Sequence, residues 1–578
     1  MNKETTEIKF KEMIFLAVII LLGGVLRIYT LADRSLWLDE IQQVNYYFTS
    51  DSIWNLFNKA AIHFQTPLDY LIGYSMVSIF GFSEFIVRFP AFLWGSFSLI
   101  PIYLLTRYIF YIEVAIISGI FISSSRWMIA YSQEARPYSI FIFFLFLTLY
   151  YIVRAVSENK YRDWVLYCIT AILLLLTRGY EPIVAIFVIY IITLSIYIIR
   201  WPNIEMQYWK NIIVKLTKVN IIITIIYIPF IYLVLKQLLS TKYISGQQNH
   251  IYNLWYFLSS IKNYYYTLTF PITHLITLLL LTGFMIIIIN RKNCLWRAWF
   301  VSMAIFIPFF QLLIYLLLVN MNNAPFATRY MIYWLPFIYI ICSYAIAEIG
   351  KLITFIFKGK VNYVVVTSLI VLPILVIFST NTVAYYHTKK DDWRGSSQYI
   401  KSIIKPGDIV WVESAIPFGL YGGWQPRFEG KYVYYQDIND LSTDRLIDYI
   451  VEHVDAEGCV LLVYIGNIGN KELIKFNRNQ VIIQQFTGMN VIKLINPNYL
   501  LKDNILDLLE EMQNIYPGNS SSVRIYLAKA RLLFAEKKYE DSYKVIRKAK
   551  ALVQQDQITR FNESVDKYFP GMDSKQIE

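Results

Sequence analysis

The sequence predicts a polytopic α-helical membrane protein with a C-terminal extracytoplasmic domain. Of its 578 residues, 56% are hydrophobic and only 16% are charged, and the mean hydropathy is +0.44. These values are far more apolar than those of a soluble protein. Lys and Arg are concentrated in alternate loops, and the sequence becomes polar after residue 380. Together these observations indicate a helical membrane bundle followed by a folded outer domain.

Eleven segments are predicted to cross the membrane, because each contains about 20 mostly apolar residues. The first follows three lysines and has no small-residue cleavage site after it, so we expect a span rather than a signal peptide. Segment 67–82 is short and interrupted by Gly73, which indicates an interfacial helix; if it spans, the count becomes twelve. The predicted spans are 13–31, 86–106, 112–131, 138–156, 163–178, 181–199, 216–236, 272–290, 298–319, 330–350 and 362–380.

The distribution of Lys and Arg predicts a cytoplasmic N-terminus. With that orientation, the cytoplasmic loops 107–111, 154–162, 200–215, 291–297 and 351–361 contain 13 Lys and Arg residues. The short outer loops 132–137, 179–180 and 320–329 contain only two. Positive residues are enriched on the cytoplasmic side of membrane proteins. Eleven spans therefore place everything after residue 380 outside the cytoplasm.

The net charge does not indicate nucleic-acid binding, and the cysteines do not indicate a disulfide framework or a zinc site. The formal charge of +12 fits the cytoplasmic loops, so we expect no nucleic-acid partner. The four cysteines, Cys168, Cys294, Cys342 and Cys459, are scattered without metal-ligand or CxxC spacing. We therefore expect neither a disulfide framework nor a zinc site.

Two adjacent carboxylates, Asp39 and Glu40, follow the first predicted span in the outer loop 32–85. Carboxylates beside hydrocarbon are costly unless they face water, a partner or a substrate, and Trp37 suits a membrane–water interface. The alternative is that the Asp caps the following helix. Other charged residues recur at outer helix ends, in segments 131–138, 177–182 and 322–330. This pattern predicts a charged site on the outer side.

The polar region after residue 380 is predicted to form two parts. Residues 381–499 read as an α/β domain, with an amphipathic helix at 393–404 and strands at 409–414, 459–465, 481–486 and 490–495. Residues 500–578 read as helical, and 523–552 have the spacing of a single tetratricopeptide-like hairpin. Residues 1–380 form the membrane domain in this division.

Several short segments occur in a fixed order along the chain: Leu36-Trp37-Leu38-Asp39-Glu40, 63–70, 81–90, 131–138, Arg329-Tyr330 and Asp392-Trp393-Arg394. In this order they resemble motifs of the polytopic lipid-linked-sugar glycosyltransferases of the GT-C fold. The resemblance is greatest to the bacterial protein O-mannosyltransferase and lipid A aminoarabinose transferase group, over roughly residues 10–410. That group usually has two prolines after the His, whereas His63 is followed by Phe64-Gln65-Thr66-Pro67.

The resemblance implies an enzyme that moves a sugar from a polyprenyl-phosphate carrier to an acceptor outside the cytoplasm. The departing phosphate needs positive charge, and the acceptor hydroxyl needs a base. Direct displacement would invert the anomeric centre. The resemblance favours Asp39 as the base. Because adjacent side chains point in different directions, Glu40 would position Asp39 or contact the substrate.

The same resemblance suggests residues that bind the donor, each with a structural alternative. Arg136 and Arg329 are expected to contact the carrier phosphate, although each could instead anchor a helix end at the interface. Tyr138 is expected beside them.

Four further candidates also have structural alternatives. Glu84 and Arg88 are four residues apart and could pair along one helix. Arg178 could bind the substrate or form a turn ion pair with Glu181. His63 has no second His near it, so we predict no metal or cofactor; a divalent cation between Asp39 and Glu84 is the remaining option.

Other function classes fit the sequence less well. A polysaccharide polymerase or ligase would show a large late loop rather than an early Asp-Glu loop. A transporter or flippase would show internal repeats and charges within spans, and neither is present. A binding scaffold built on the C-terminal helices would leave the two early carboxylates unexplained. The expected partners are thus a lipid-linked sugar, an outer acceptor and the bilayer.

The predicted topology can be tested with a reporter fused after residue 400. A reporter that works only outside the cytoplasm should be active there, because eleven spans end on the outer side. Activity of a strictly cytoplasmic reporter at the same position would contradict both the topology and the outer location of the charged site.

Overall fold

The computed structural model describes most of the membrane region and selected parts of the rest. The described residues are 10–62, 67–199, 206–240, 254–289, 295–322, 328–388, 390–403, 409–412, 420–421, 460–465, 481–486, 489–494, 526–527, 530, 533–534, 538–553, 561–562, 565 and 569. The chain divides into two compact units. The first contains residues 1–34 and 42–388, and the second contains residues 35–41 and 389–578.

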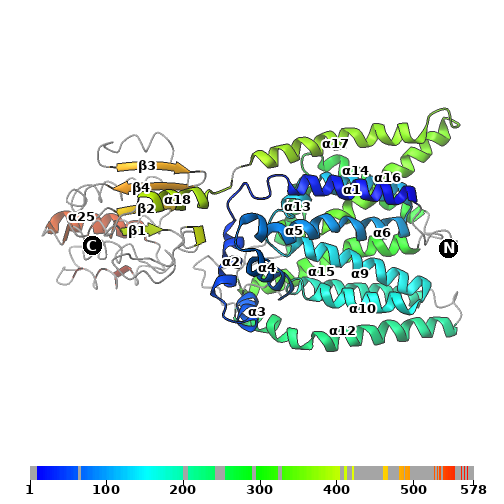
Figure 1. Cartoon of the computed structure of the whole chain (residues 1–578), viewed down its shortest axis with the longest axis horizontal. Helices are drawn as coiled ribbons and strands as arrows, with labels where there is room; N and C mark the ends of the chain where they lie inside the picture. Colours follow the sequence, from blue (N-terminus) through cyan, green and yellow to red (C-terminus); the bar gives the residue numbers. More distant parts are fainter. Residues whose placement is uncertain are drawn as a thin grey trace. The chain divides into compact units, whose positions relative to one another are not determined.

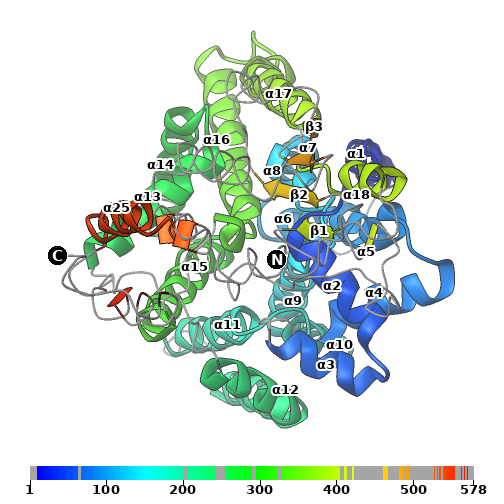
Figure 2. The same cartoon turned by 90° about the vertical axis from the view of Figure 1, so that its left-hand side faces the viewer.

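The first unit is a helix bundle. Figures 1 and 2 show α7 packed on α1, α9 on α10, and α16 on α14 and α17. The short helices α3 and α4 lie at one end of it (Figure 1). Its helices are α1 (Phe10–Ile28), α2 (Leu38–Thr49), α3 (Ile53–Ile62), α4 (Pro67–Phe80), α5 (Glu84–Phe97), α6 (Leu99–Ile109), α7 (Ile112–Ser124), α8 (Arg126–Ala130), α9 (Tyr138–Glu158), α10 (Tyr161–Leu175), α11 (Glu181–Ile199), α12 (Met206–Ser240), α13 (Leu254–Thr269), α14 (Thr273–Ile289), α15 (Leu295–Asn322), the 3-10 helix η4 (Thr328–Met331), α16 (Trp334–Ile356) and α17 (Tyr363–His387).

Each segment predicted to cross the membrane coincides with helix in the structure. Within the described residues, six helices are long and apolar enough to span, and α13 and α14 form a seventh candidate bent by 107°. The chain is therefore a polytopic helical membrane protein. The count of eleven remains a prediction, because helices such as α7 and α11 are apolar but shorter.

Three predicted spans differ from the structure in detail. The predicted span 112–131 is divided at Ser125 into α7 and α8. The predicted span 86–106 lies within one candidate span, Glu84–Ile109, which is interrupted at Ser98 between α5 and α6. Pro101 explains the break, because proline has no N–H to donate to the carbonyl four residues earlier. The predicted span 330–350 begins later, at Trp334, because η4 occupies the preceding residues. Arg329 accordingly lies in a 3-10 turn ahead of α16 rather than opening that helix.

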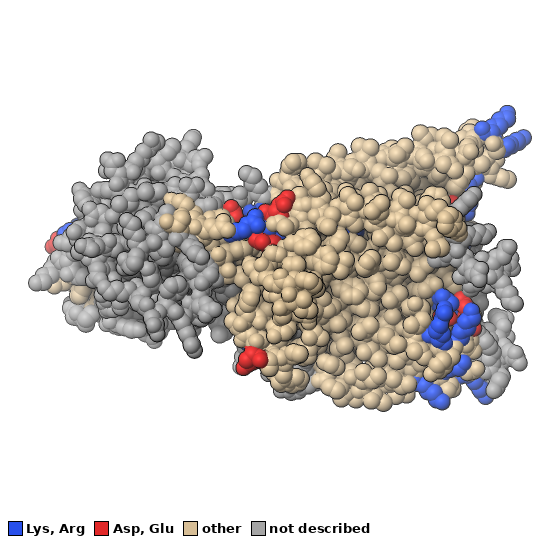
Figure 3. Space-filling view, viewed as in Figure 1, with Lys and Arg blue, Asp and Glu red and all other residues tan. Residues whose placement is uncertain are grey.

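Charge is segregated along the bundle. On the face seen in Figure 3, most Lys and Arg side chains of this unit gather at one end, while the broad flank between the ends is uncharged. That end carries the exposed residues Lys160, Arg162, Lys351, Lys358 and Lys360, in the α9–α10 and α16–α17 turns. A positively charged end beside an uncharged flank is the distribution expected of a bundle that crosses a membrane.

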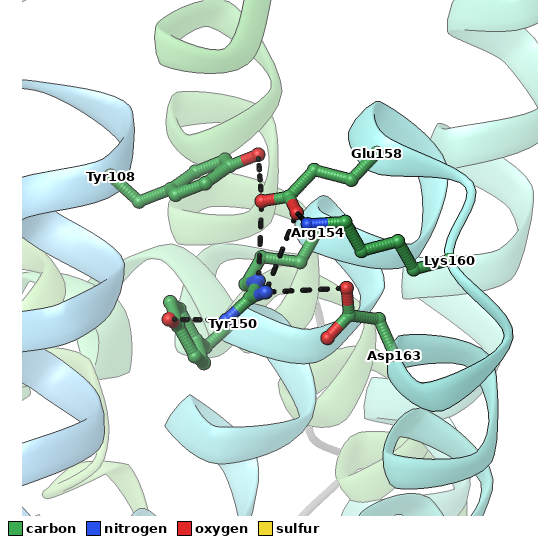
Figure 4. A network of polar contacts seen from close by, with 6 residues as sticks. All are labelled: Tyr108, Tyr150, Arg154, Glu158, Lys160 and Asp163. Atoms are coloured by element: carbon green, nitrogen blue, oxygen red, sulfur yellow. Dashed lines mark hydrogen bonds and ion pairs between the residues drawn. The ribbon is translucent and has the colours of Figure 1, made fainter. Parts of the chain in front are cut away.

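A polar network joins α6, α9 and α10 near this charged end (Figure 4). Arg154 Nη2 lies 3.4 Å from Asp163 Oδ2, and its Nε lies 3.4 Å from Glu158 Oε1. Glu158 also accepts hydrogen bonds from Tyr108 (3.3 Å) and Lys160 (2.7 Å). Asp163 is completely buried, so its charge depends on Arg154 for compensation.

The second unit contains a four-stranded sheet. The strands are β1 (Ile409–Val412), β2 (Val460–Ile465), β3 (Val481–Phe486) and β4 (Met489–Leu494), in the order β1-β2-β4-β3. β1 and β2 are parallel and the other pairs are antiparallel. Strands β2, β3 and β4 occur within a residue of the predicted segments. β1 begins at the predicted Ile409, and the last two residues of its predicted segment 409–414 lie outside the described residues. Helix α18 (Trp393–Ile403) matches the predicted amphipathic helix.

The last part of the chain is described only in places. Helix α25 (Tyr539–Lys550) contributes Val545, Ile546 and Ala549 to a small apolar cluster with Leu533 and Phe569. This helix falls in the second half of the predicted hairpin 523–552. The first half lies largely outside the described residues, as does most of 500–525.

We expect Arg154→Met to destabilise the protein by about 3 to 5 kcal/mol, because it leaves the buried Asp163 carboxylate uncompensated. Thermal unfolding of the purified protein in detergent measures this. Lys160→Met is the matched control: Lys160 bonds to the same Glu158, but its side chain is 59% exposed. Its loss should change stability by no more than about 0.5 kcal/mol. Equal effects of the two substitutions would contradict the role of Arg154 in compensating the Asp163 charge.

Candidate functional site

The first turn of α2 is held by Glu40. The backbone N–H of Trp37 donates to Glu40 Oε2 at 2.8 Å, in the arrangement in which a side chain at the third helical position returns to the N-cap. Glu40 is fully buried, whereas Asp39 is partly exposed. The capping that the sequence suggested for an Asp is thus performed by Glu40, and it fixes the turn that carries Asp39.

The residues before α2 are bound to the start of α18, within the second unit. Ser35 Oγ donates to Asp392 Oδ1 (3.2 Å) and accepts from the backbone N–H of Arg394 (3.1 Å). Asp392 Oδ1 also accepts from Gly395 N (2.8 Å), which caps α18. A Cβ at Gly395 would lie 2.3 Å from Asp392 Oδ2, so the cap requires glycine. The contact between Ser35 and the start of α18 therefore joins the chain next to the 36–40 motif to the 392–394 motif.

In the first unit, three arginines from separate segments converge on Tyr138. The charges of Arg136, Arg178 and Arg329 all act on the Tyr138 hydroxyl. Arg178 Cζ lies 4.8 Å from the Tyr138 ring centroid, and both Arg178 and Arg329 lie 5.7 Å from that of Tyr330. Tyr138 itself is buried. The sequence placed these four residues in a donor-binding set, and the structure brings them together.

Arg178 also forms the ion pair that the sequence offered as its alternative role. Its Nη2 lies 2.8 Å from Glu181 Oε1, and Gln311 Nε2 donates to the Glu181 carbonyl at 2.9 Å. Arg178 and Glu181 are both buried. Arg178 is thus held rigidly, while Arg136 and Arg329 are half-buried.

The turn that carries Arg136 is held by the buried side chain of Gln133. Gln133 Nε2 donates to the carbonyls of Arg27 (2.9 Å) and Tyr29 (2.5 Å) at the end of α1. Its Oε1 accepts from the Tyr385 hydroxyl of α17 at 2.9 Å. An amide bonded at three points cannot rotate, so the turn is fixed relative to both helices.

Arg88 performs a similar task for the segment that follows α1. Its Nη1 donates to the carbonyls of Leu31 (3.0 Å) and Arg34 (2.9 Å), just before the 36–40 motif. Arg88 is buried on α5, as is Glu84 in the first turn of that helix. Arg88 therefore shapes the chain that leads to Asp39.

Asp69 is a buried carboxylate that the sequence-based assignment of site residues did not include. It accepts a 2.8 Å hydrogen bond from Gln43 Nε2, which also donates to the Tyr47 hydroxyl at 2.7 Å. Burial raises the pKa of the Asp69 carboxyl, while the Gln43 hydrogen bond and the charge of Arg136 act to lower it. The signal was present, since Asp69 is the sole acidic residue between Asp51 and Glu84.

Backbone contact brings Asp69 to the arginine cluster. The N–H of Leu68, in the first turn of α4, donates to the carbonyl of Leu176 at 3.1 Å, two residues before Arg178. Asp69 thus follows a residue bonded to the segment that leads to Arg178, and the charge of Arg136 acts on its carboxylate.

The option of a divalent cation between Asp39 and Glu84 stays a prediction. Within the described part of the chain, no group of three or more His, Cys, Asp and Glu side chains is arranged to hold a metal ion. His63 lies outside the described residues.

Comparison with known proteins identifies the fold. Residues 65–203 match the family model for dolichyl-phosphate-mannose-protein mannosyltransferase. The solved structure of ArnT from Cupriavidus metallidurans in the apo state aligns with a TM-score of 0.52 and 12% identity, over 83% of this chain and 97% of that chain. The fold is that of the GT-C glycosyltransferases.

The structure of the same ArnT bound to undecaprenyl phosphate aligns with the GT-C chain described here at a TM-score of 0.50, with the same identity and coverage. A search of curated proteins finds no match to the sequence. The region matched by the family model extends from α4 to α11 and contains Asp69, Arg136 and Arg178. At 12% identity the structural likeness establishes the fold and leaves the activity to be argued from the site.

Proposed function

We propose that this GT-C protein is a membrane glycosyltransferase that moves a sugar from a polyprenyl-phosphate carrier to an acceptor outside the cytoplasm. One observation carries the proposal: Arg178 and Arg329 both lie 5.7 Å from the Tyr330 ring centroid, and Arg178 also packs on Tyr138, whose backbone N–H donates to the Arg136 carbonyl. Guanidinium groups bind phosphate oxygens in a bidentate manner. The name of the family matched by residues 65–203 contains a lipid-linked sugar phosphate, dolichyl-phosphate-mannose. The similar structure of ArnT was solved with bound undecaprenyl phosphate.

The arginine cluster suits the change in charge during the reaction. The linkage between carrier and sugar is a phosphodiester with one negative charge. When the bond from the anomeric carbon to the phosphate oxygen breaks, the departing carrier phosphate gains a second negative charge. Positive groups held in place before the reaction stabilise that developing charge without reorganising. Arg136 and Arg329 are assigned the direct contact with phosphate, because both are half-buried whereas Arg178 is buried.

Asp39 is assigned the role of base. As the acceptor hydroxyl attacks the anomeric carbon from the side opposite the phosphate, its proton passes to the Asp39 carboxylate. One displacement inverts the anomeric centre and needs no covalent enzyme intermediate. The assignment is supported by the partial exposure of Asp39 on a turn fixed by Glu40. The acceptor, whether a protein, a lipid or an envelope glycan, is an open choice within this proposal.

Arg136→Lys and Arg329→Lys should each weaken binding of undecaprenyl phosphate by about tenfold to a hundredfold. Lysine keeps the charge but loses the bidentate fork, and a hydrogen bond to a charged group contributes about 1.5 to 3 kcal/mol. Titration of the carrier into purified protein in nanodiscs measures the affinity. Arg162→Lys, at the exposed cytoplasmic end, is the matched control. Wild-type affinity in both variants would contradict the assignment of Arg136 and Arg329 to the carrier phosphate.

Asp39→Asn should slow sugar transfer by about a hundredfold to ten-thousandfold, the usual cost of losing a general base. Carrier binding should be unchanged, because the base acts on the acceptor. Label transfer from polyprenyl-phosphate sugars to the acceptor in membranes measures the rate. Asp51→Asn removes a carboxylate with no burial and should have no effect. Glu40→Gln should slow transfer less than Asp39→Asn. Near-normal transfer by Asp39→Asn would exclude the residue from catalysis, and Glu84 would be the next candidate.

A further inference from the structure

The side chains of Gln43, Tyr47 and Asp69 form a buried polar cluster between α2 and α4, within the first unit. The same amide nitrogen of Gln43 donates to Asp69 Oδ2 at 2.8 Å and to the Tyr47 hydroxyl at 2.7 Å. Both amide hydrogens are therefore in use. The Tyr47 hydroxyl accepts one of them and keeps its own hydrogen for another partner.

One oxygen in this cluster has no hydrogen-bond donor. Gln43 is 2% exposed, and among the described residues its Oε1 accepts no hydrogen bond. The amide cannot turn over to relieve this, because the carbonyl oxygen would then face the Asp69 carboxylate, which only accepts when ionised. A buried acceptor without a donor indicates a group that the protein alone does not supply.

The cluster is adjacent to the arginines assigned to the donor phosphate. The charge of Arg136 acts on both Asp69 and Tyr47. The bond from Leu68 N to Leu176 O connects the start of α4 to the turn that carries Arg178. A sugar is joined directly to its carrier phosphate. Its ring hydroxyls therefore lie close to the side chains that bind that phosphate.

The chemistry of the cluster matches a carbohydrate. A sugar presents neighbouring hydroxyls that donate and accept, and its ring packs on aromatic faces. Here a carboxylate and an amide carbonyl accept, and a tyrosine hydroxyl donates. Tyr70 lies against Tyr46 and Tyr47, with ring centroids 6.4 and 6.1 Å away. A Cβ at Gly73 would lie 2.1 Å from the Tyr47 hydroxyl oxygen, so glycine is required to keep Tyr47 in place.

We propose that Asp69 and Gln43 form the subsite that binds hydroxyl groups of the donor sugar, and so select which sugar is transferred. The inference rests on the proposed function, because it takes the neighbouring arginines to hold the donor phosphate. Two other roles are possible for the same contacts. The cluster would be a structural pin between α2 and α4, or Asp69 would only position Arg136.

The three roles predict different binding behaviour. The experiment compares bare undecaprenyl phosphate with undecaprenyl phosphate linked to mannose, glucose, galactose or 4-amino-arabinose, using protein in nanodiscs. For wild type, at least one sugar-linked carrier should bind more tightly than the bare carrier. Asp69→Asn should weaken binding of that sugar-linked carrier by about tenfold to a hundredfold, as expected for lost hydrogen bonds to a charged group. Its affinity for the bare carrier should be unchanged.

Asp69→Asn is suited to this test because its amide oxygen can still accept the hydrogen bond from Gln43. Gln43→Met, which removes the unmatched acceptor, is the second variant and should show the same selective loss. The matched control is Asp163→Asn, a buried carboxylate in the first turn of α10 that belongs to the network of Figure 4. It should affect neither ligand relative to wild type. Thermal unfolding of each variant identifies any loss of structure.

Three results would overturn the inference. Equal weakening for bare and sugar-linked carriers in Asp69→Asn would show that Asp69 only positions Arg136. Lower thermal stability with unchanged affinity for both would show a structural pin. If wild type binds the bare carrier but no sugar-linked carrier more tightly, the cluster does not bind sugar. Failure of wild type to bind any of these lipids would instead contradict the proposed function.

Discussion

Arg27 is a charged side chain buried completely within an apolar helix bundle, and the outer end of that bundle depends on its hydrogen bonds. Its guanidinium donates to the carbonyls of Gly23, Ile122 and Ser123 and to the Ser132 hydroxyl, at 2.9 to 3.2 Å. A buried guanidinium is stable only when its donors are satisfied. Satisfying Arg27 therefore fixes α1, the end of α7 and the turn after α8 relative to one another.

The same turn then positions the arginine assigned to phosphate. Ser132 and Gln133 are both bonded to the end of α1, through the Arg27 side chain and the Arg27 carbonyl. A Cβ at Gly95 would lie 2.0 Å from Ser132 Oγ, so α5 also approaches closely here. Arg136 follows three residues after Gln133 and inherits this rigidity. Two arginines of the bundle are thus satisfied differently: carboxylates compensate Arg154 near the α9–α10 turn, whereas backbone carbonyls accept most of the hydrogen bonds of Arg27 at the end of α1.

Local pattern was sufficient to predict much of this architecture. Apolar length located the membrane helices, and alternation with flanking turn residues located the four strands of the second unit. The pairing of Arg178 with Glu181 is also local, because the two residues are separated by one helical turn. The resemblance of ordered motifs grouped Arg136, Arg329 and Tyr138, whereas the approach of Arg329 to the other two depends on tertiary packing.

The residues that the sequence did not assign are those whose environment is created by packing. Asp69 reads as a first-turn acidic residue in an apolar helix. Its burial and its bond to Gln43 depend on α2 folding over α4, which no local pattern reports. The different roles of Asp39 and Glu40 could also be assigned only from the structure, because the hydrogen bond from Trp37 N shows that Glu40 caps the helix.

The second unit is discontinuous in sequence, because residues 35–41 belong with residues 389–578. Ser35 is bonded to Asp392 and to the backbone of Arg394, and Leu36 N donates to the Tyr421 hydroxyl at 2.7 Å. The polar C-terminal region is therefore not a removable appendage. A chain shortened to its membrane helices would keep Asp39 in its sequence but lose the partners that hold the strand of chain before it. Evolution by exchange of C-terminal regions is constrained in the same way, since any replacement must supply an equivalent of the Asp392 cap to receive Ser35.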